Sequence, residues 1–132
     1  MRKEYEMNDD EIHKSLEIHW AASNENDFEA EHQIYREDAI LDYPQSGERI
    51  RGRENIQASR AAQPSRKRFS PQRILGAGNL WITELVIAYD GRPSFVVSIM
   101  EFEAGRVARE TQYFSEPFPP GPSRTQWVER IP

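Results

Sequence analysis

Apolar side chains recur every four residues near the start of the chain. Ile12, Leu16 and Trp20 have this spacing within residues 9–24, and His19 lies beside them. Side chains four residues apart share one face of a helix, and an apolar face has to be covered by other parts of the protein. The pattern therefore predicts a helix over residues 9–24 with one buried face.

A second, shorter helix is predicted to open near Asp27. Phe28, His32 and Tyr35 follow at positions i, i+4 and i+7 of one helical face. The polar residues 23–26 separate this segment from the first helix. Two short consecutive helices favour packing as a hairpin.

The next segment combines a short strand with a weaker helix. Residues 39–43 are a β-prone run, which Pro44 and the following turn residues stop. Residues 53–63 are predicted to form a third helix, in which Ile56 is the only large apolar side chain.

From residue 71 onward the pattern changes to that of β-strands. Asp90-Gly91, between two apolar runs, is the strongest hairpin signal in the sequence. Helices followed by an antiparallel meander predict the α+β class. One helical hairpin cannot fill the concave face of a long bent sheet, so part of that face is expected to remain as a pocket. The predicted strands and turns are residues 81–89, Asp90-Gly91, 94–102, 103–105 and 106–114.

The length of 132 residues predicts a single domain over residues 1–132. Residues 1–8 form an N-terminal arm, and residues 115–132 form a proline-rich C-terminal extension that cannot continue the sheet. We expect Trp127 and this extension to fold over the pocket mouth or over a subunit interface.

Strand alternation predicts which side chains face the pocket. On residues 81–89 the odd-numbered side chains share one face, while the mostly apolar even-numbered ones share the other. The second face suggests burial against another subunit, so we expect a homodimer formed through the outer face of the sheet. The candidates for chemistry in the pocket are His19, Tyr43 and Glu110, and the other predicted pocket-lining residues are Trp20, Trp81, Thr83, Leu85, Ile87, Ser98, Gln112 and Phe114.

Charge and composition narrow the functional classes. The net charge is −5, yet residues 49–80 hold eight bases against one acid. No aromatic side chains interleave the run Arg66-Lys67-Arg68, so this segment is interpreted as a solvated face, and we expect neither nucleic-acid nor membrane partners. The absence of cysteine, of an apolar leader and of a membrane-length apolar stretch predicts a cytoplasmic protein.

Three ordered segments resemble the SnoaL-like branch of the nuclear transport factor 2-like superfamily. They are residues 26–44 with Tyr-Arg-Glu-Asp-Ala at 35–39, residues 47–56 with glycines at 47 and 52, and residues 98–114. The resemblance implies a cone-shaped fold, in which helices lie on a strongly curved sheet around an apolar cavity, commonly in homodimers. Members include ketosteroid isomerase, polyketide cyclases, dehydratases, hydrolases and binding proteins, so the fold alone does not select a function.

The resemblance argues against ketosteroid isomerase activity. The position of the isomerase's catalytic aspartate is matched by Tyr43, that of its oxyanion tyrosine by His19, and that of its second oxyanion acid by Ser98. All three isomerase groups are therefore replaced in this chain.

Glu110 is the inward-facing carboxylate nominated for acid–base work. Burial is expected to raise its pKa towards that role. The structural alternative is that Glu110 bonds Arg36, Arg124 or a neighbouring strand group and only stabilises the fold. His19 likewise has two interpretations, as a satisfied core residue or as a proton shuttle.

Motifs for other chemistry are missing from the sequence. Gly76-Ala77-Gly78 leads into a strand and lacks the third glycine of a dinucleotide site, and the three histidines have no metal-ligand spacing. We expect neither a cofactor nor a metal. The leading hypothesis is a small, largely apolar ligand in the pocket, with cofactor-free isomerisation, cyclisation or dehydration if the protein is an enzyme. The alternatives are a non-catalytic ligand carrier and a dimeric interaction module with a filled cavity.

Overall fold

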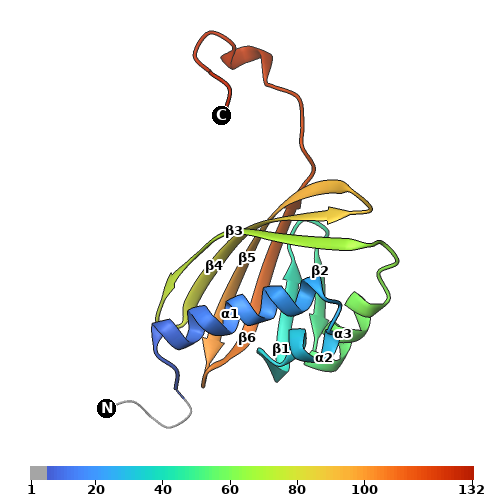
Figure 1. Ribbon diagram of the computed structural model, residues 1–132, viewed down its shortest axis with the longest axis vertical. Coiled ribbons are helices and arrows are strands. Elements are labelled where there is room, and N and C mark those ends of the chain that lie inside the picture. Colours follow the sequence, from blue (N-terminus) through green and yellow to red (C-terminus); the bar gives the residue numbers. More distant parts are fainter. Residues whose placement is uncertain (1–5) are drawn as a thin grey trace.

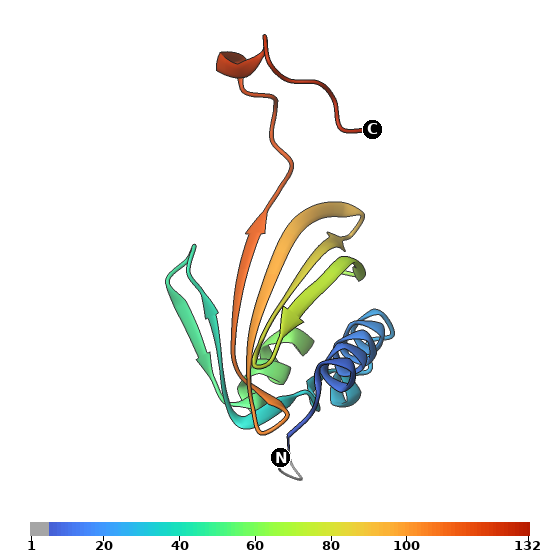
Figure 2. The ribbon, with the colours of Figure 1, turned by 90° about the vertical axis from the view of Figure 1, so that its left-hand side faces the viewer.

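The computed structural model describes residues 6–132, and its helices cover the concave side of one curved sheet (Figures 1 and 2). The first five residues of the predicted N-terminal arm lie outside the described part. The α+β class is confirmed. In chain order the elements are α1 (Asp9–Asn24), α2 (Phe28–His32), β1 (Tyr35–Tyr43), β2 (Glu48–Arg51), α3 (Arg53–Ala61), β3 (Lys67–Ala77), β4 (Leu80–Tyr89), β5 (Arg92–Glu103), β6 (Arg106–Ser115) and the short 3-10 helix η1 (Pro122–Arg124).

The sheet has six strands in the order β2-β1-β6-β5-β4-β3. Strands β3 to β6 form the expected antiparallel meander, while β1 pairs with β6 in parallel, which makes the sheet mixed. Strand β2, which the sequence pattern did not predict, pairs with β1 at the edge. Since β2 and β3 remain unpaired edges, the sheet does not close into a barrel.

Helix α1 has the predicted bounds because its ends are defined locally. The Asn8 side chain accepts a hydrogen bond from the Glu11 backbone N–H at 2.8 Å, and acidic residues occupy the first turn, where the helix dipole favours them. Helix α2 is shorter than predicted. It ends at His32, and Tyr35 is the first residue of β1.

Two hairpin turns set the register of the meander. Asp90 and Gly91 have φ angles of 52° and 82°, and Ala104 and Gly105 have 52° and 78°. Consecutive positive φ angles are those of the two-residue turn whose twist matches the flanking strands. Both turns fall where the sequence predicted them.

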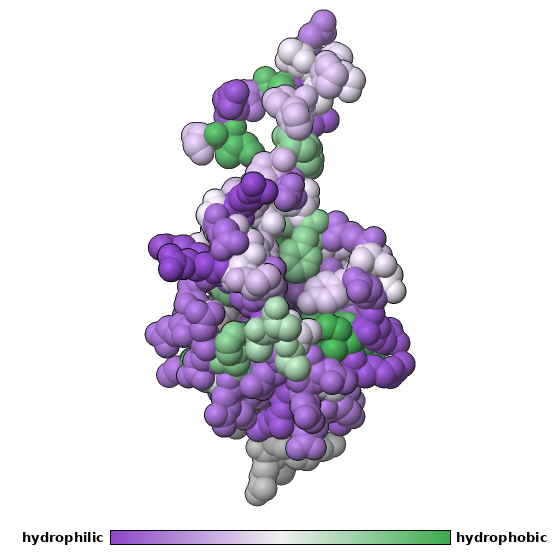
Figure 3. All heavy atoms as spheres, turned by 90° about the vertical axis from the view of Figure 1, so that its right-hand side faces the viewer, coloured by the Kyte–Doolittle hydropathy of each residue, from purple (hydrophilic) through white to green (hydrophobic). Residues whose placement is uncertain are grey.

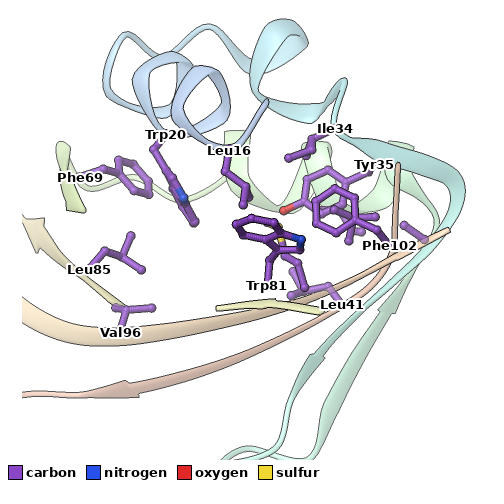
Figure 4. Close-up of a cluster of buried hydrophobic side chains, with 14 of the residues drawn as sticks. Leu16, Trp20, Ile34, Tyr35, Leu41, Phe69, Trp81, Leu85, Val96 and Phe102 are labelled. Atoms are coloured by element: carbon purple, nitrogen blue, oxygen red, sulfur yellow. The ribbon is translucent and has the colours of Figure 1, made fainter. Parts of the chain in front are cut away.

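The core lies between α1 and the concave face of the sheet (Figure 4). Leu16 and Trp20 point from α1 towards the strands, and Trp81 from β4 lies among them. Leu16 is fully buried, and Trp20 and Trp81 are 3% and 4% exposed. The predicted alternation on β4 is confirmed, since Trp81, Thr83, Leu85 and Ile87 are buried and the side chains between them are only half-buried.

The C-terminal extension leaves the sheet at the end of β6 and stands clear of the body (Figures 1 and 3). Phe118 and Trp127 are 74% and 78% exposed. The extension therefore does not cover the pocket mouth of its own chain, which corrects that part of the expectation. The prolines between residues 117 and 122 keep the segment extended, so it continues away from β6.

Leu16 and Ile18 offer a matched test of the core. We expect Leu16→Ala to lower the free energy of unfolding by about 2–5 kcal/mol, because a fully buried side chain leaves a cavity. Ile18 is on the same helix but 56% exposed, so Ile18→Ala should cost far less. Urea denaturation of both variants measures the difference, and equal losses would contradict this account of the core.

Candidate functional site

Glu110 lies at the centre of the sheet's concave face. It sits on β6 opposite Leu41 of β1 and Met100 of β5. Its side chain is completely buried, as strand alternation predicted. A carboxylate in such a place is costly unless its oxygen atoms are hydrogen-bonded.

Both oxygens of Glu110 are saturated with donors. Oε1 accepts from the Tyr35 hydroxyl and from Arg60 Nη2, the latter at 3.2 Å. Oε2 accepts from Ser98 Oγ at 2.5 Å and from Gln112 Nε2 at 2.7 Å. A carboxylate offers about four lone-pair sites, so none is left for a substrate or a water.

The pKa of Glu110 moves in the direction opposite to the one expected. Burial by itself would raise it, but the positive charge of Arg60 and the hydrogen bonds from Ser98 and Tyr35 outweigh burial and lower the pKa. The prediction of a raised pKa is therefore wrong. Glu110 is held as an anion that orients its four donors.

Arg60 is the cation that makes this burial possible. It lies on α3 one turn after the buried Ile56, so both side chains face the sheet. Its Nη1 donates to the Tyr35 hydroxyl at 2.9 Å and to His32 Nε2 at 3.2 Å. Burial would lower the pKa of Arg60, but Tyr35 and Glu110 raise it above its ordinary value, so the charge is permanent.

The partners expected for Glu110 under the structural alternative are found only in part. The neighbouring strand groups Ser98 and Gln112 bind it. Arg36 instead donates to Asp38 at 2.9 Å, and Arg124 lies in the C-terminal extension. The cation comes from α3, which packs on β1 and β2 and whose Arg60 side chain reaches Glu110 on β6.

Glu31 is a second buried carboxylate, and it is bound very differently. Its side chain is 4% exposed, and its nearest positively charged or titratable neighbours are Arg60 Nη1 and His32 Nδ1, each at 4.0 Å. Within residues 6–132 no donor lies at hydrogen-bond distance from its carboxylate oxygens. The Glu31 oxygens thus keep lone pairs that Glu110 has lost.

His19 is neutral and has a fixed tautomer. Its Nδ1 donates to the backbone carbonyl of Glu31 at 2.6 Å, which leaves Nε2 as an acceptor. Among the described residues, this Nε2 is the one fully enclosed side-chain nitrogen or oxygen without a partner, whereas the Glu31 side chain lines a cavity. Burial lowers the pKa of His19 to about 4.

A cavity of about 180 Å³ opens between the three helices and the strands β1, β2, β3, β4 and β6. Glu31, Arg60, Gln63, Lys67 and Ser59 line its polar side, and the apolar and aromatic side chains around it are Trp20, Tyr43, Ile50, Phe69, Ile87, Tyr89 and Phe114, with Gln112 between the two groups. Apolar walls with a few polar groups are usual for small-molecule sites.

Five of the predicted residues line this cavity: Trp20, Tyr43, Ile87, Gln112 and Phe114. The others lie on the same concave face but in its packed part. Glu110 and Ser98 bind each other beneath the cavity, while Trp81, Thr83 and Leu85 belong to the core, where Trp20 Nε1 donates to Thr83 Oγ1 at 3.3 Å. His19 contacts Trp20 but does not reach the lining.

Two tyrosines at the cavity keep their protons. Burial raises the pKa of Tyr43 and of Tyr89, so both hydroxyls are hydrogen-bond donors at neutral pH. Lys67 lies at the same rim, where its Nζ donates to the Arg60 carbonyl at 3.1 Å, and burial lowers its pKa.

A larger hollow of about 560 Å³ lies beside Asp38, Leu80 and Glu101, and every charged side chain that lines it is exposed. Residues 6–132 contain no cluster of three or more His, Asp or Glu side chains arranged to hold a metal ion. No helix in this part of the chain has the length and apolarity to cross a membrane.

Sequence reasoning missed Arg60, Tyr35 and Glu31 as site residues. Arg60 had one usable signal, its position four residues after the only large apolar residue of its helix. Tyr35 was identified in a family motif and on an apolar stripe, but its hydroxyl partner is 75 residues away. Nothing local distinguishes Glu31 from the exposed Glu29 on the same short helix.

The buried His19 predicts how stability depends on pH. Its pKa is about 4 in the folded chain against 6.5 when unperturbed, so the unfolded state binds more protons between these values. Stability should therefore fall as the pH drops from 6.5 to 4, by about 3 kcal/mol for this group. Burial also lowers the pKa of His32, which acts in the same direction.

Urea denaturation across this pH range tests the prediction. His19→Gln removes the titrating ring but keeps a donor for the Glu31 carbonyl, and it should flatten the slope. His13→Gln is the control, because His13 is 45% exposed on the same helix. A slope that both variants leave unchanged would show that His19 is not the group responsible.

The sequence model of the SnoaL-like domain matches residues 16–110. A crystal structure of an NTF-2 like protein of unknown function from Burkholderia xenovorans LB400 is 55% identical, with a TM-score of 0.88 over 96% of this chain and 100% of that one. None of the curated protein sequences matches the chain.

Two more distant structures share the fold. An LEH-like epoxide hydrolase from M. tuberculosis is 22% identical, with a TM-score of 0.69 over 80% of this chain and 83% of that one. A Catenulispora acidiphila DSM 44928 protein of ketosteroid isomerase-like fold, in complex with trimethylamine, is 16% identical, with a TM-score of 0.66 over 76% and 85%. With most of its length matched by one family and its fold shared by these structures, the chain belongs to the SnoaL-like domain family of the nuclear transport factor 2-like superfamily.

Proposed function

We propose that the protein binds a small, largely apolar carbonyl compound in the cavity beside Arg60 and moves a proton on it without a cofactor. The observation that carries the proposal is the Glu31 carboxylate, which is buried at the cavity wall and has no hydrogen-bond donor within reach among the described residues. A general base needs a free lone pair and a position at the site where the substrate binds. Glu31 lines the cavity, and its carboxylate oxygens keep free lone pairs.

The size of the cavity limits the ligand. Its volume of about 180 Å³ is close to the roughly 150 Å³ of an engineered protein cavity that takes up benzene. A molecule with one ring fits, and Phe69, Ile87 and Phe114 supply apolar contact for it. A steroid would not fit, in line with the replacement of the isomerase residues.

The polar groups around Glu31 suit proton abstraction next to a carbonyl group. In the proposed step Glu31 takes a proton from the carbon beside the carbonyl, and the bonding electrons move onto the carbonyl oxygen. The Tyr43 hydroxyl and an N–H of Arg60 donate to that oxygen as its charge develops. If the substrate has a β,γ-double bond, return of the proton from Glu31 to the γ-carbon completes an isomerisation. If it has a hydroxyl on the β-carbon, the C–O bond breaks, the hydroxyl leaves as water with the proton from Glu31, and a dehydration is complete.

Glu110 and His19 have supporting parts in this scheme. Glu110 is saturated by four donors, so it holds Arg60 and Gln112 in place and does not act as the base. His19 binds the Glu31 backbone carbonyl and so positions the turn of α2 that carries the Glu31 side chain. Among the nominated catalytic residues, Tyr43 keeps a direct role as a donor.

Acetophenone in D₂O provides a direct test, since its methyl group exchanges hydrogen for deuterium only through the enolate. We expect the protein to accelerate this exchange, as followed by NMR. Glu31→Gln should reduce the acceleration about 100-fold, within the range for loss of a general base. Chemical-shift changes measure acetophenone binding in the same samples.

Glu29→Gln is the matched control, because Glu29 is exposed on the same helix and should not affect exchange. If acetophenone binds but its hydrogen exchange is not accelerated, the catalytic part of the proposal is refuted and the protein is a ligand carrier. If acetophenone and other single-ring ketones all fail to bind, the cavity is not a site for this class of compound.

A further inference from the structure

Exposed large apolar side chains gather on two surfaces of the molecule. Among residues 6–132 there are nine, and only Ile18 lies elsewhere. Leu75, Leu80, Phe95 and Tyr113 are on the outer face of the sheet, and Phe118, Trp127, Val128 and Ile131 are on the C-terminal extension. Contiguous exposed apolar surface of this kind usually marks an interaction site.

The outer face carries a groove of about 400 Å³ next to the end of β6. Val86, Phe95 and Tyr113 line it, from three adjacent strands. The charges at its side are already paired, since Arg73 Nε donates to Glu84 Oε1 at 2.8 Å. An apolar segment can therefore occupy the groove without leaving a charge unpaired.

The part of the C-terminal extension beyond β6, residues 116–132, has local structure, but no hydrogen bond ties its apolar end to the rest of the described chain. Trp127 N–H donates to the Arg124 carbonyl at 3.0 Å, and Thr125 Oγ1 donates to the Pro122 carbonyl at 2.9 Å, which together fix a turn ahead of the apolar end. Among the described residues no hydrogen bond joins residues 117–132 to the body. Figure 1 shows the segment directed away from it.

The Burkholderia relative indicates that the extension is part of the shared fold. An alignment over 96% of 132 residues leaves out about five of them, fewer than the 17 of the extension. All of the chain in that crystal structure is matched, so most of the extension has a counterpart there. Terminal segments are usually poorly ordered unless something holds them, and within residues 6–132 no hydrogen bond holds the apolar end of this one.

We propose that the extension of one copy packs into the outer-face groove of a second copy, and that two copies exchange extensions reciprocally. Residues 116–121, which lead from the end of β6 to η1, reach about 19 Å at the spacing of proline-rich chain, more than the roughly 10 Å between packed sheets. In an exchange related by a two-fold axis, each extension packs into the groove of the other copy, so one kind of contact buries both apolar surfaces. It leaves the cavity mouth open, so it does not depend on the proposed reaction.

Photo-crosslinking locates the partner surface. The full chain with benzoylphenylalanine at position 127 is prepared once with ¹⁴N and once with ¹⁵N, and the two preparations are mixed. The mixture is irradiated and digested, and the crosslinked peptides are identified by mass spectrometry. We expect mixed-isotope crosslinks to the outer-face residues of β4, β5 and β6. Crosslinks within one copy, crosslinks to the cavity mouth around Arg60, or a lack of crosslinks would each overturn the proposal.

Sedimentation equilibrium gives an independent measurement. The wild-type chain should sediment at twice its mass of 15.4 kDa. Trp127→Asp with Ile131→Asp, and separately Phe95→Asp, should weaken the dimer about tenfold or more, because each places a charge in an apolar contact. These side chains are exposed in the single chain, so the variants should still fold, which circular dichroism checks.

Ile18→Asp is the matched control, because Ile18 is 56% exposed but lies outside both surfaces. It should leave the dissociation constant unchanged. A monomeric wild-type chain, or a dimer that the position 127 and 131 substitutions do not weaken, would refute the exchange.

Discussion

The buried ion pair between Glu110 and Arg60 is the interaction on which the rest of the structure depends. Its atoms come from β6 and α3, with Tyr35 of β1 and Ser98 of β5 bound to the same carboxylate. Removing either charge would leave the other buried and unpaired, which is far more costly than the loss of an exposed pair. The pair thus fixes where α3 sits over the sheet, and so where the cavity lies.

The same ion pair also distinguishes the two buried carboxylates by their hydrogen bonds. Glu110 is ionised and has no free lone pair, whereas Glu31, 4.0 Å from Arg60, keeps its oxygens free at the cavity wall. Two identical side chains near the same arginine, one on α2 and one on β6, are therefore bound differently: Glu110 orients donors, and Glu31 is left free for the role that we propose for it. Burial alone does not make a carboxylate a base, because its hydrogen-bond partners decide whether it can react.

The apolar surfaces of the molecule are also of two kinds, one covered and one exposed. The concave face is covered by α1 and closed by its own side chains, except at the cavity. Within the described part of the chain, the outer face and the C-terminal extension leave large apolar side chains exposed. Trp127 is a clear case, since the extended, proline-stiffened residues 117–122 before it lead the chain away from its own domain.

Local sequence determined the elements: the bounds of α1, the hairpin turns at Asp90-Gly91 and Ala104-Gly105, the alternation of β4 and the burial of Glu110. These follow from periodicity, capping and turn chemistry, which act over a few residues. Only the tertiary structure decided that Arg60 rather than Arg36 binds Glu110, that Tyr35 begins a strand, and that Glu31 reaches the cavity. Those outcomes join residues that are 25 to 75 positions apart, and no short pattern specifies which of many equivalent charged side chains the folded chain brings together.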